Sequence, residues 1–247
     1  MIRAVAPDVG ETLTRDDRYW SSRADWLGVP RHTLSALVGA VVAQGRDNSD
    51  AVRLLRPDID PAAEYIARET AGRGEYPDES DLYQDVRPAL TALRRTGVRV
   101  VVAGNQTVRA GELLRGLGLP VDAVATSGDW GVSKPDPEFF GKVVKPAGVR
   151  APHQVLYVGD HPANDIYPAR EAGLSTAHLR RGPWGHLWAD DPTVRAAADW
   201  SIESLYDLIP FMGKSNRVTV SEPPDRDEVP GTQSPRSGGT GACSPAY

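Results

Sequence analysis

The run Val155-Leu156-Tyr157-Val158-Gly159-Asp160 constrains the fold more than any other part of the chain. Its first four residues are apolar or aromatic and mostly β-formers, which is typical of a buried strand in a parallel sheet. The glycine lets the chain turn, and a second acid, Asp165, follows Asp160 at a distance of five positions. A strand that ends in Gly-Asp brings its acid to the carboxyl edge of the sheet, where ligands of open α/β sheets bind. The run therefore predicts a ligand site at that edge.

Helices and strands alternate along most of the chain. Short apolar runs predict strands, and the stretches between them, several of which open on an N-cap residue, predict helices. The expected strands span residues 2–6, 98–102, 122–126, 155–158 and 174–179, and the expected helices span 87–95, 107–115, 137–144, 166–172 and 204–209. This alternation predicts an α/β fold with a Rossmann-like parallel sheet and helices on both faces, formed by residues 1–13 and 85–212.

Residues 14–84 interrupt the alternation because they carry no strand signal. Apolar side chains recur there at helical spacing, at Leu34, Leu37, Val38, Val41 and Val42. Such a stripe is typical of an amphipathic helix. Asp60 and Pro61 are residue types typical of the N-cap and the first position of a second helix. We expect about four helices here, inserted into the α/β core as a small all-helical subdomain.

Composition and charge limit the class of protein. Residues 213–247 are rich in Ser, Pro, Gly and charge without apolar periodicity, so we expect disorder there. The net charge of −5 argues against nucleic acid or an anionic membrane as a partner. The single cysteine, Cys243, excludes an intrachain disulfide, and neither a signal peptide nor an apolar run long enough to span a membrane is evident. We expect a cytoplasmic protein, as a monomer or homodimer.

Polar residues follow three of the expected strands. Asp8 lies after the first strand, Asn105 after the second, and Asp160 and Asp165 after the fourth, while a loop carries Lys134. Two like charges 4 Å apart repel by about 4 kcal/mol at an effective dielectric constant of 20, so acids gathered in one cleft either raise their own pKa values or need a cation. Oxygen ligands without a His or Cys cluster favour Mg²⁺, which often shares its coordination with a substrate phosphate. The pattern indicates phosphoryl chemistry on a small phosphorylated substrate.

These residues resemble the four ordered motifs of the haloacid dehalogenase (HAD) superfamily. The matching motifs are Asp8-x-x-x-Thr12-Leu13, Asn105, Lys134-Pro135-Asp136-Pro137 and Gly159-Asp160-x-x-x-x-Asp165, and the helical insert after the first resembles the C1 cap of that superfamily's phosphatases. The resemblance implies that Asp8 is the nucleophile and forms an aspartyl-phosphate, and that Lys134 neutralises it and the phosphoryl oxygens. It also implies that Asn105, Gly104 and Thr12 bind phosphate, and that Mg²⁺ is held by Asp8, Asp160, Asp165 and the carbonyl of Gly10.

Two departures from the family pattern leave alternatives open. Gly10 stands where the phosphatases carry a second Asp as general acid and base, and Gly104 stands where they carry a hydroxyl residue. Either the enzyme is slow with poor leaving groups, or Glu11 or a residue of the insert supplies the proton. The haloacid dehalogenases, which work without metal, also lack the second Asp, so carbon–halogen hydrolysis is one alternative. A non-catalytic, phosphate-binding HAD-like protein is another. The intact metal pair favours a Mg²⁺-dependent phosphatase.

Overall fold

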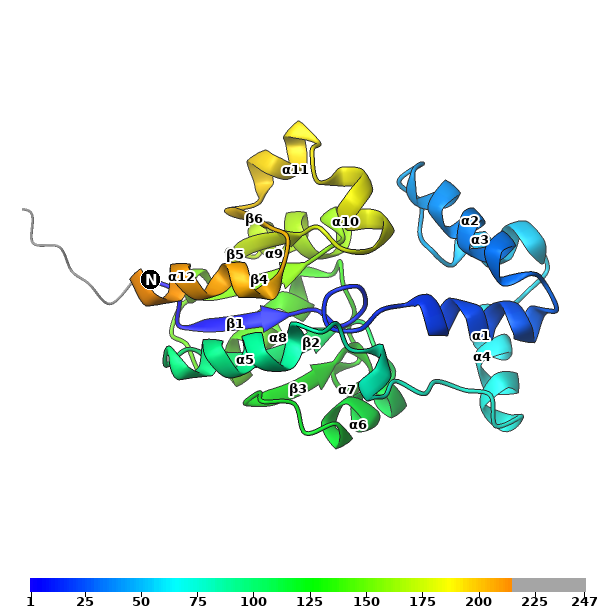
Figure 1. The fold of residues 1–247 in the computed structure, drawn as a ribbon, viewed down its shortest axis with the longest axis horizontal. Coiled ribbons are helices and arrows are strands. Elements are labelled where there is room, and N and C mark those ends of the chain that lie inside the picture. The colour runs from blue at the N-terminus through cyan, green and yellow to red at the C-terminus, as the bar shows by residue number, and fades with distance from the viewer. Residues whose placement is uncertain (215–247) are drawn as a thin grey trace, which may run out of the picture. The chain divides into compact units, whose positions relative to one another are not determined.

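The computed structural model describes residues 1–214, and six parallel strands form its central sheet (Figure 1). The strands are β1 (Ala4–Pro7), β2 (Arg99–Gly104), β3 (Ala123–Thr126), β4 (Val155–Gly159), β5 (Ser175–Leu179) and β6 (Trp200–Ile202). They lie in the order β3-β2-β1-β4-β5-β6, with Val5 opposite Val100 on one side and Leu156 on the other. The predicted α/β fold with a parallel sheet is confirmed.

Successive side chains of a strand point to opposite faces of the sheet, so each of these strands places apolar residues on both faces. Val5 of β1 packs in one hydrophobic cluster, whereas its neighbours Ala4 and Ala6 pack in another on the opposite face. In β4, Leu156 joins the first cluster and Tyr157 the second. A strand that is apolar at every position is stable only between two helical layers, which explains the continuous apolar runs in the sequence.

Helices cover both faces. On one face lie α5 (Val86–Arg95), α6 (Val108–Gly116) and α12 (Ile209–Lys214), and on the other lie α8 (Pro137–Ala147) and α9 (Tyr167–Glu171). The N-caps are those expected from the sequence, since the side chain of Thr107 accepts a hydrogen bond from the N–H of Ala110 and that of Asp136 from the N–H of Glu138. A short helix, α7 (Ser127–Trp130), follows β3.

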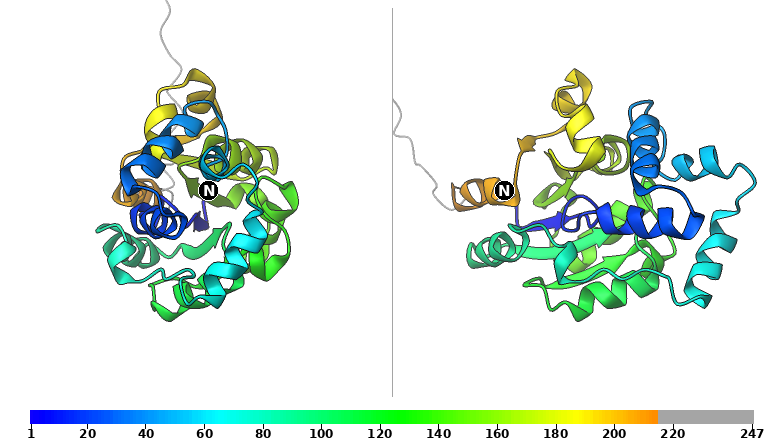
Figure 2. Two further views of the ribbon diagram at one scale, coloured as in Figure 1. Left: turned by 90° about the vertical axis from the view of Figure 1, so that its right-hand side faces the viewer. Right: turned by 45° about the vertical axis from the view of Figure 1, so that its right-hand side comes forward.

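Four helices lie between β1 and α5, as the sequence predicts: α1 (Asp17–Leu27), α2 (Arg31–Val42), α3 (Asp50–Leu55) and α4 (Pro61–Thr70). We refer to residues 17–70 as the helical insert. Figure 1 and Figure 2 show it beyond the carboxyl ends of the strands. Its apolar stripe, including Leu34, Val38 and Val41, forms a third hydrophobic cluster, which also takes in Trp184 from α10 (Gly182–Trp188). The insert therefore packs on the core through a residue distant in sequence.

Some elements differ from expectation. Strand β6 and the helices α10 and α11 (Pro192–Ala197) were not predicted, and the expected helix at 204–209 is a 3₁₀ turn (Leu205–Leu208) that continues into α12. A π-helical turn (Pro162–Ile166) precedes α9. Helix α12 reaches two residues past the expected start of disorder, and the rest of that predicted tail, 215–247, lies outside the described residues. Within the described part of the chain, no helix combines the length and the apolar character needed to cross a membrane.

Candidate active site

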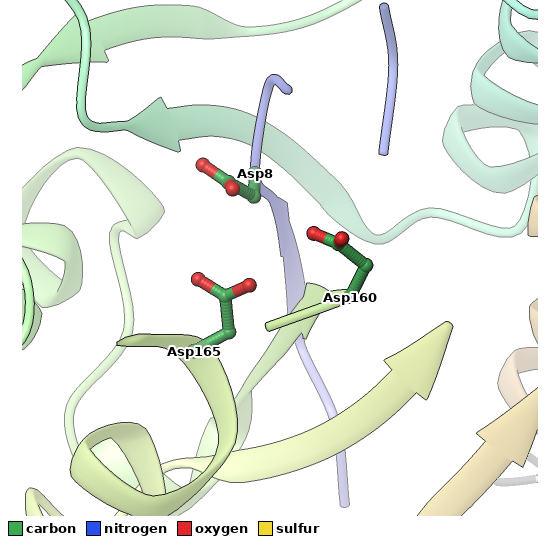
Figure 3. A group of neighbouring side chains, drawn as sticks. All are labelled: Asp8, Asp160 and Asp165. Carbon is green, nitrogen blue, oxygen red and sulfur yellow. The ribbon is translucent and has the colours of Figure 1, made fainter. Parts of the chain in front are cut away.

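Three carboxylates meet where the strand order of the sheet reverses. β1 lies between β2 and β4, and a crevice opens at the carboxyl ends of strands at such a point. Asp8 follows β1, Asp160 follows β4, and Asp165 lies in the turn after β4. In Figure 3 the three side chains point toward one another. One oxygen from each lies within 4.8 Å of the others, and all three residues are buried.

Backbone contacts fix these acids in place. The N–H of Asp8 donates to the carbonyl of Val158 at 2.8 Å, so the end of β1 is tied to β4. The carboxylate of Asp165 accepts the N–H of His161 at 2.9 Å. A Cβ at Gly159 would overlap that carboxylate, which explains why glycine precedes Asp160. His178 on β5 contributes a contact that the sequence did not reveal, because its Nε2 lies 2.8 Å from the carbonyl of Asp160.

Lys134 lies between two of the acids. Its Nζ is 2.8 Å from Asp8 and 2.6 Å from Asp165, and the side chain is buried. The side-chain amide of Asn105 forms two hydrogen bonds with the backbone of Lys134. The Lys134 N–H donates to Asn105 Oδ1 at 2.8 Å, and Asn105 Nδ2 donates to the Lys134 carbonyl at 3.0 Å. The Asn105 side chain thus positions the lysine, and the residue lines the cavity next to Asp8.

Two further expected residues lie differently. A Cβ added at Gly104 would come within 2.5 Å of an Asp8 oxygen, so this glycine lets the Asp8 side chain lie flat against β2. Thr12 is fully buried, and its hydroxyl has no hydrogen-bond partner among the described residues. Its carbonyl accepts a hydrogen bond from Arg181 at 2.8 Å. Neither Thr12 nor Gly104 lines a cavity next to the acids, whereas Gly10 does.

The acids and the lysine perturb one another's protonation. Burial raises the pKa of Asp8 to about 6, against the opposing effect of Lys134. Burial, together with the charges of Asp165 and Asp8, raises the pKa of Asp160 well above its usual range. For Lys134, burial acts to lower the pKa, but the charges of Asp165 and Asp8 outweigh it and the pKa is raised. The lysine therefore stays protonated and compensates for only part of the negative charge.

The donor set fits a hard divalent cation. The ammonium group of Lys134 contacts two of the three carboxylates, and the carboxylate of Asp160 makes no hydrogen bond or ion pair with the described residues. At 4.8 Å and an effective dielectric constant of 20, each pair of these charges repels by about 3 kcal/mol. All the ligand atoms are oxygens, which favours Mg²⁺ over zinc. A cation at this position would remove a repulsion that the described residues leave uncompensated.

One cavity adjoins the three acids, and a second, larger cavity shares part of its lining. The smaller, about 330 Å³, is lined by Asp8, Lys134, Asp160 and Asp165, and also by His161. The ring of His161 stacks on Trp184 at 3.7 Å between centroids, and burial lowers the pKa of His161 to about 4. The larger cavity, about 890 Å³, extends toward the insert, where its lining includes Tyr19, Trp20, Ser22, Arg23 and Arg68.

Asp16 lines both cavities, although it belongs to none of the sequence motifs. It lies just before α1, between the first motif and the insert. Burial raises the pKa of its carboxyl group, and the charges of Glu11 and Asp8 raise it further. The signal that could have identified it is its separation of only eight positions from Asp8, at the point where the chain passes from core to insert.

The family model for haloacid dehalogenase-like hydrolases matches residues 2–173, which include all of the acids described above. The chain belongs to this family. The HAD fold expected from the motif order is therefore confirmed, and the matched range contains both the helical insert and the Asp8-Asp160-Asp165 cluster.

Relatives within the family carry phosphatase names. Phosphoserine phosphatase of Thermus thermophilus is 35% identical over 149 residues, which are 59% of this chain and 54% of the relative. Glyceraldehyde 3-phosphate phosphatase of Methanocaldococcus jannaschii is 32% identical over 130 residues, 51% of this chain and 54% of the relative. The chain thus spans about half the length of these relatives. A predicted phosphoglycolate phosphatase from Haemophilus somnus shares the fold, with a TM-score of 0.62, 18% identity, and coverage of 85% of this chain and 97% of that one.

Proposed function

We propose that this HAD-like hydrolase is a Mg²⁺-dependent phosphatase that hydrolyses a small phosphorylated metabolite through an aspartyl-phosphate. The observation that carries the proposal is the buried cluster of Asp8, Asp160 and Asp165 with Lys134 at the strand crossover, since it combines a nucleophile, a cation site and a fixed positive charge. The phosphatase names of the relatives support the reaction class.

Each residue would have a distinct part in the reaction. Asp8 attacks phosphorus, because it is the acid at the tip of β1 and Lys134 at 2.8 Å keeps it ionised and oriented. The same Lys134 ammonium neutralises phosphoryl oxygens as charge builds on them. Asp8, Asp160, Asp165 and the carbonyl of Gly10 would hold Mg²⁺, which when bound screens the acids from one another and from the phosphate.

The larger cavity would take the rest of the substrate. Its volume, about 890 Å³, lies within the range of small-molecule sites. The helical insert supplies part of its lining, so we propose that the insert is a cap that selects the substrate and excludes water from the reacting phosphate. Phosphoserine and glyceraldehyde 3-phosphate, named in the relatives' activities, are the first substrates to test.

Metal-independent carbon–halogen hydrolysis is supported by one feature, the glycine at position 10. The arrangement of Asp160 argues against it. A dehalogenase without metal has no use for a third buried carboxylate that lacks a cationic partner, and keeping such a charge buried is unfavourable. A non-catalytic phosphate binder would not need the buried lysine to contact Asp8. We therefore favour the phosphatase.

The test uses p-nitrophenyl phosphate, whose leaving group needs no proton, with either Mg²⁺ or EDTA. We expect release of p-nitrophenolate that requires Mg²⁺ and that Asp8→Asn abolishes. Asp190→Asn is the matched control, because it neutralises an exposed carboxylate outside both cavities. Equal activity of the Asp8 variant and wild type would refute the nucleophile assignment, and hydrolysis of 2-haloacids in EDTA would favour the dehalogenase.

A further inference from the structure

The two cavities meet at a short boundary, and the residues along it are almost all neutral. Asp8 and Lys134 line only the smaller cavity, and Arg23 and Arg68 only the larger. The residues that line both are Gly10, Asp16, Trp20, Asn48, Asn105, Gln106 and Asn164. Asp16 is the only ionisable side chain among them. With the phosphate over Asp8 and the organic part in the larger cavity, the bond that breaks lies at this boundary.

Asp16 also lies beside Gly10, the position at which the family's phosphatases carry the second Asp. A Cβ added at Gly10 would lie 3.4 and 3.5 Å from the two carboxylate oxygens of Asp16. An aspartate side chain at position 10 would therefore reach into the place that Asp16 already fills. The Asp16 carboxylate makes no hydrogen bond or ion pair with the described residues, so the fold does not use it as a structural link.

Neighbouring candidates are engaged elsewhere. Glu11, the acid next to Gly10, uses one oxygen to accept the N–H of Asp16 at 3.0 Å and the other to accept the hydroxyl of Tyr83. It therefore fixes the backbone of Asp16. His161 lines only the smaller cavity, its ring lies against Trp184, and its Nδ1 accepts the N–H of Asn164 at 3.2 Å.

We propose that Asp16 is the general acid and base of this enzyme, in place of the residue replaced by Gly10; the inference rests on the proposed phosphatase function. As an Asp8 oxygen bonds to phosphorus and the bond from phosphorus to the leaving oxygen breaks, the Asp16 carboxyl group gives its proton to that oxygen and the alcohol departs. The Asp16 carboxylate then takes a proton from a water molecule whose oxygen bonds to phosphorus. The bond to Asp8 breaks, phosphate leaves, and Asp16 is protonated again.

The test is Asp16→Asn in the full chain with Mg²⁺, assayed on p-nitrophenyl phosphate and on glycerol phosphate. Nitrophenolate leaves without a proton, so the first step survives: we expect a burst of about one equivalent, then turnover slowed by about 10²-fold because water lacks a base. Glycerol phosphate should show no burst and a loss of at least about 10²-fold, since its alkoxide needs the acid. A purely structural role would slow both substrates equally without a burst.

Three further variants complete the experiment. Asp58→Asn, the same change elsewhere in the insert, should leave both substrates at wild-type rates, because that side chain is exposed and lines neither cavity. Gly10→Asp combined with Asp16→Ala should recover turnover of glycerol phosphate, since position 10 accepts a Cβ without a close contact and alanine at position 16 leaves room for the new carboxylate. Unchanged kinetics in Asp16→Asn, or the substrate-selective loss appearing in His161→Asn instead, would overturn the assignment. An inactive wild type would refute the proposed function itself.

Discussion

Asp8→Asn is expected to stabilise the metal-free protein at neutral pH, although it removes the nucleophile. Burial sets the pKa of Asp8 at about 6 in the folded state, against a usual value of 3.8. At 1.36 kcal/mol per pKa unit, this difference in pKa corresponds to about 3 kcal/mol in the free energy of unfolding. Because the folded pKa is the higher one, the contribution of Asp8 to the stability of wild type is fully present below pH 3.8 and is lost as pH rises through about 6. Asparagine does not ionise, and its oxygen can still accept from Lys134.

The assay is urea unfolding in EDTA, followed by tryptophan fluorescence, at pH 4 and pH 7.5. We expect the variant's advantage in free energy of unfolding to grow from less than about 1 kcal/mol at pH 4 to about 3 kcal/mol at pH 7.5. Mg²⁺ at about 100 times its dissociation constant should stabilise wild type by about 2.7 kcal/mol and the variant by less, since the variant has lost a carboxylate ligand.

The control for this experiment is Asp190→Asn, which changes an exposed carboxylate and should show no such growth with pH. A lower stability of Asp8→Asn than of wild type at pH 7.5 in EDTA would refute the reasoning. So would an advantage that stays the same at both pH values, because it would not come from the ionisation of Asp8.

Two other substitutions test the packing around the site. Gly104→Ala places a Cβ within 2.5 Å of an Asp8 oxygen, so turnover should fall by up to about 10²-fold because the nucleophile is displaced. An unaltered kcat would show that catalysis does not require the Asp8 side chain to lie against position 104. Trp184→Ala removes a buried indole that stacks on His161, and calorimetry should show that the free energy of unfolding falls by about 3–5 kcal/mol. Trp188→Ala, at a half-buried position, should lower it by less. Equal losses in the two variants would contradict the role of Trp184 as an anchor of the insert.

The arrangement of strand tips could be predicted because it depends on local signals. The apolar run before Asp160 and the parallel alternation of elements place Asp8 and Asp160 at one edge of the sheet without any knowledge of loops. Helix α11 could also have been predicted, since Asp191-Pro192 repeats the N-cap signal that correctly located α8 at Asp136-Pro137. Strand β6 could not, because three residues at the sheet edge carry too little pattern.

The orientations of side chains in loops could not be predicted from the sequence. Thr12 matched a family motif, yet the N–H groups of Thr12, Leu13 and Thr14 all donate to the carbonyl of Val9, and this tight turn directs the Thr12 side chain into the interior. Asn105 contacts the backbone of Lys134, 29 positions away, so its part in holding the lysine depends on how two loops meet. The position of Asp16 beside Gly10 depends in the same way on the path from β1 to α1.

The packing of Trp184 bears on how this protein could be re-engineered. The indole belongs to the α/β half by chain position, but its apolar neighbours belong to the four inserted helices, and its ring nitrogen donates to Asn48 at 2.7 Å. Excising those helices would leave a large aromatic surface bare in water, a known cause of aggregation. A chimera that exchanges substrate preference between relatives would therefore need to transfer α10 together with residues 17–70.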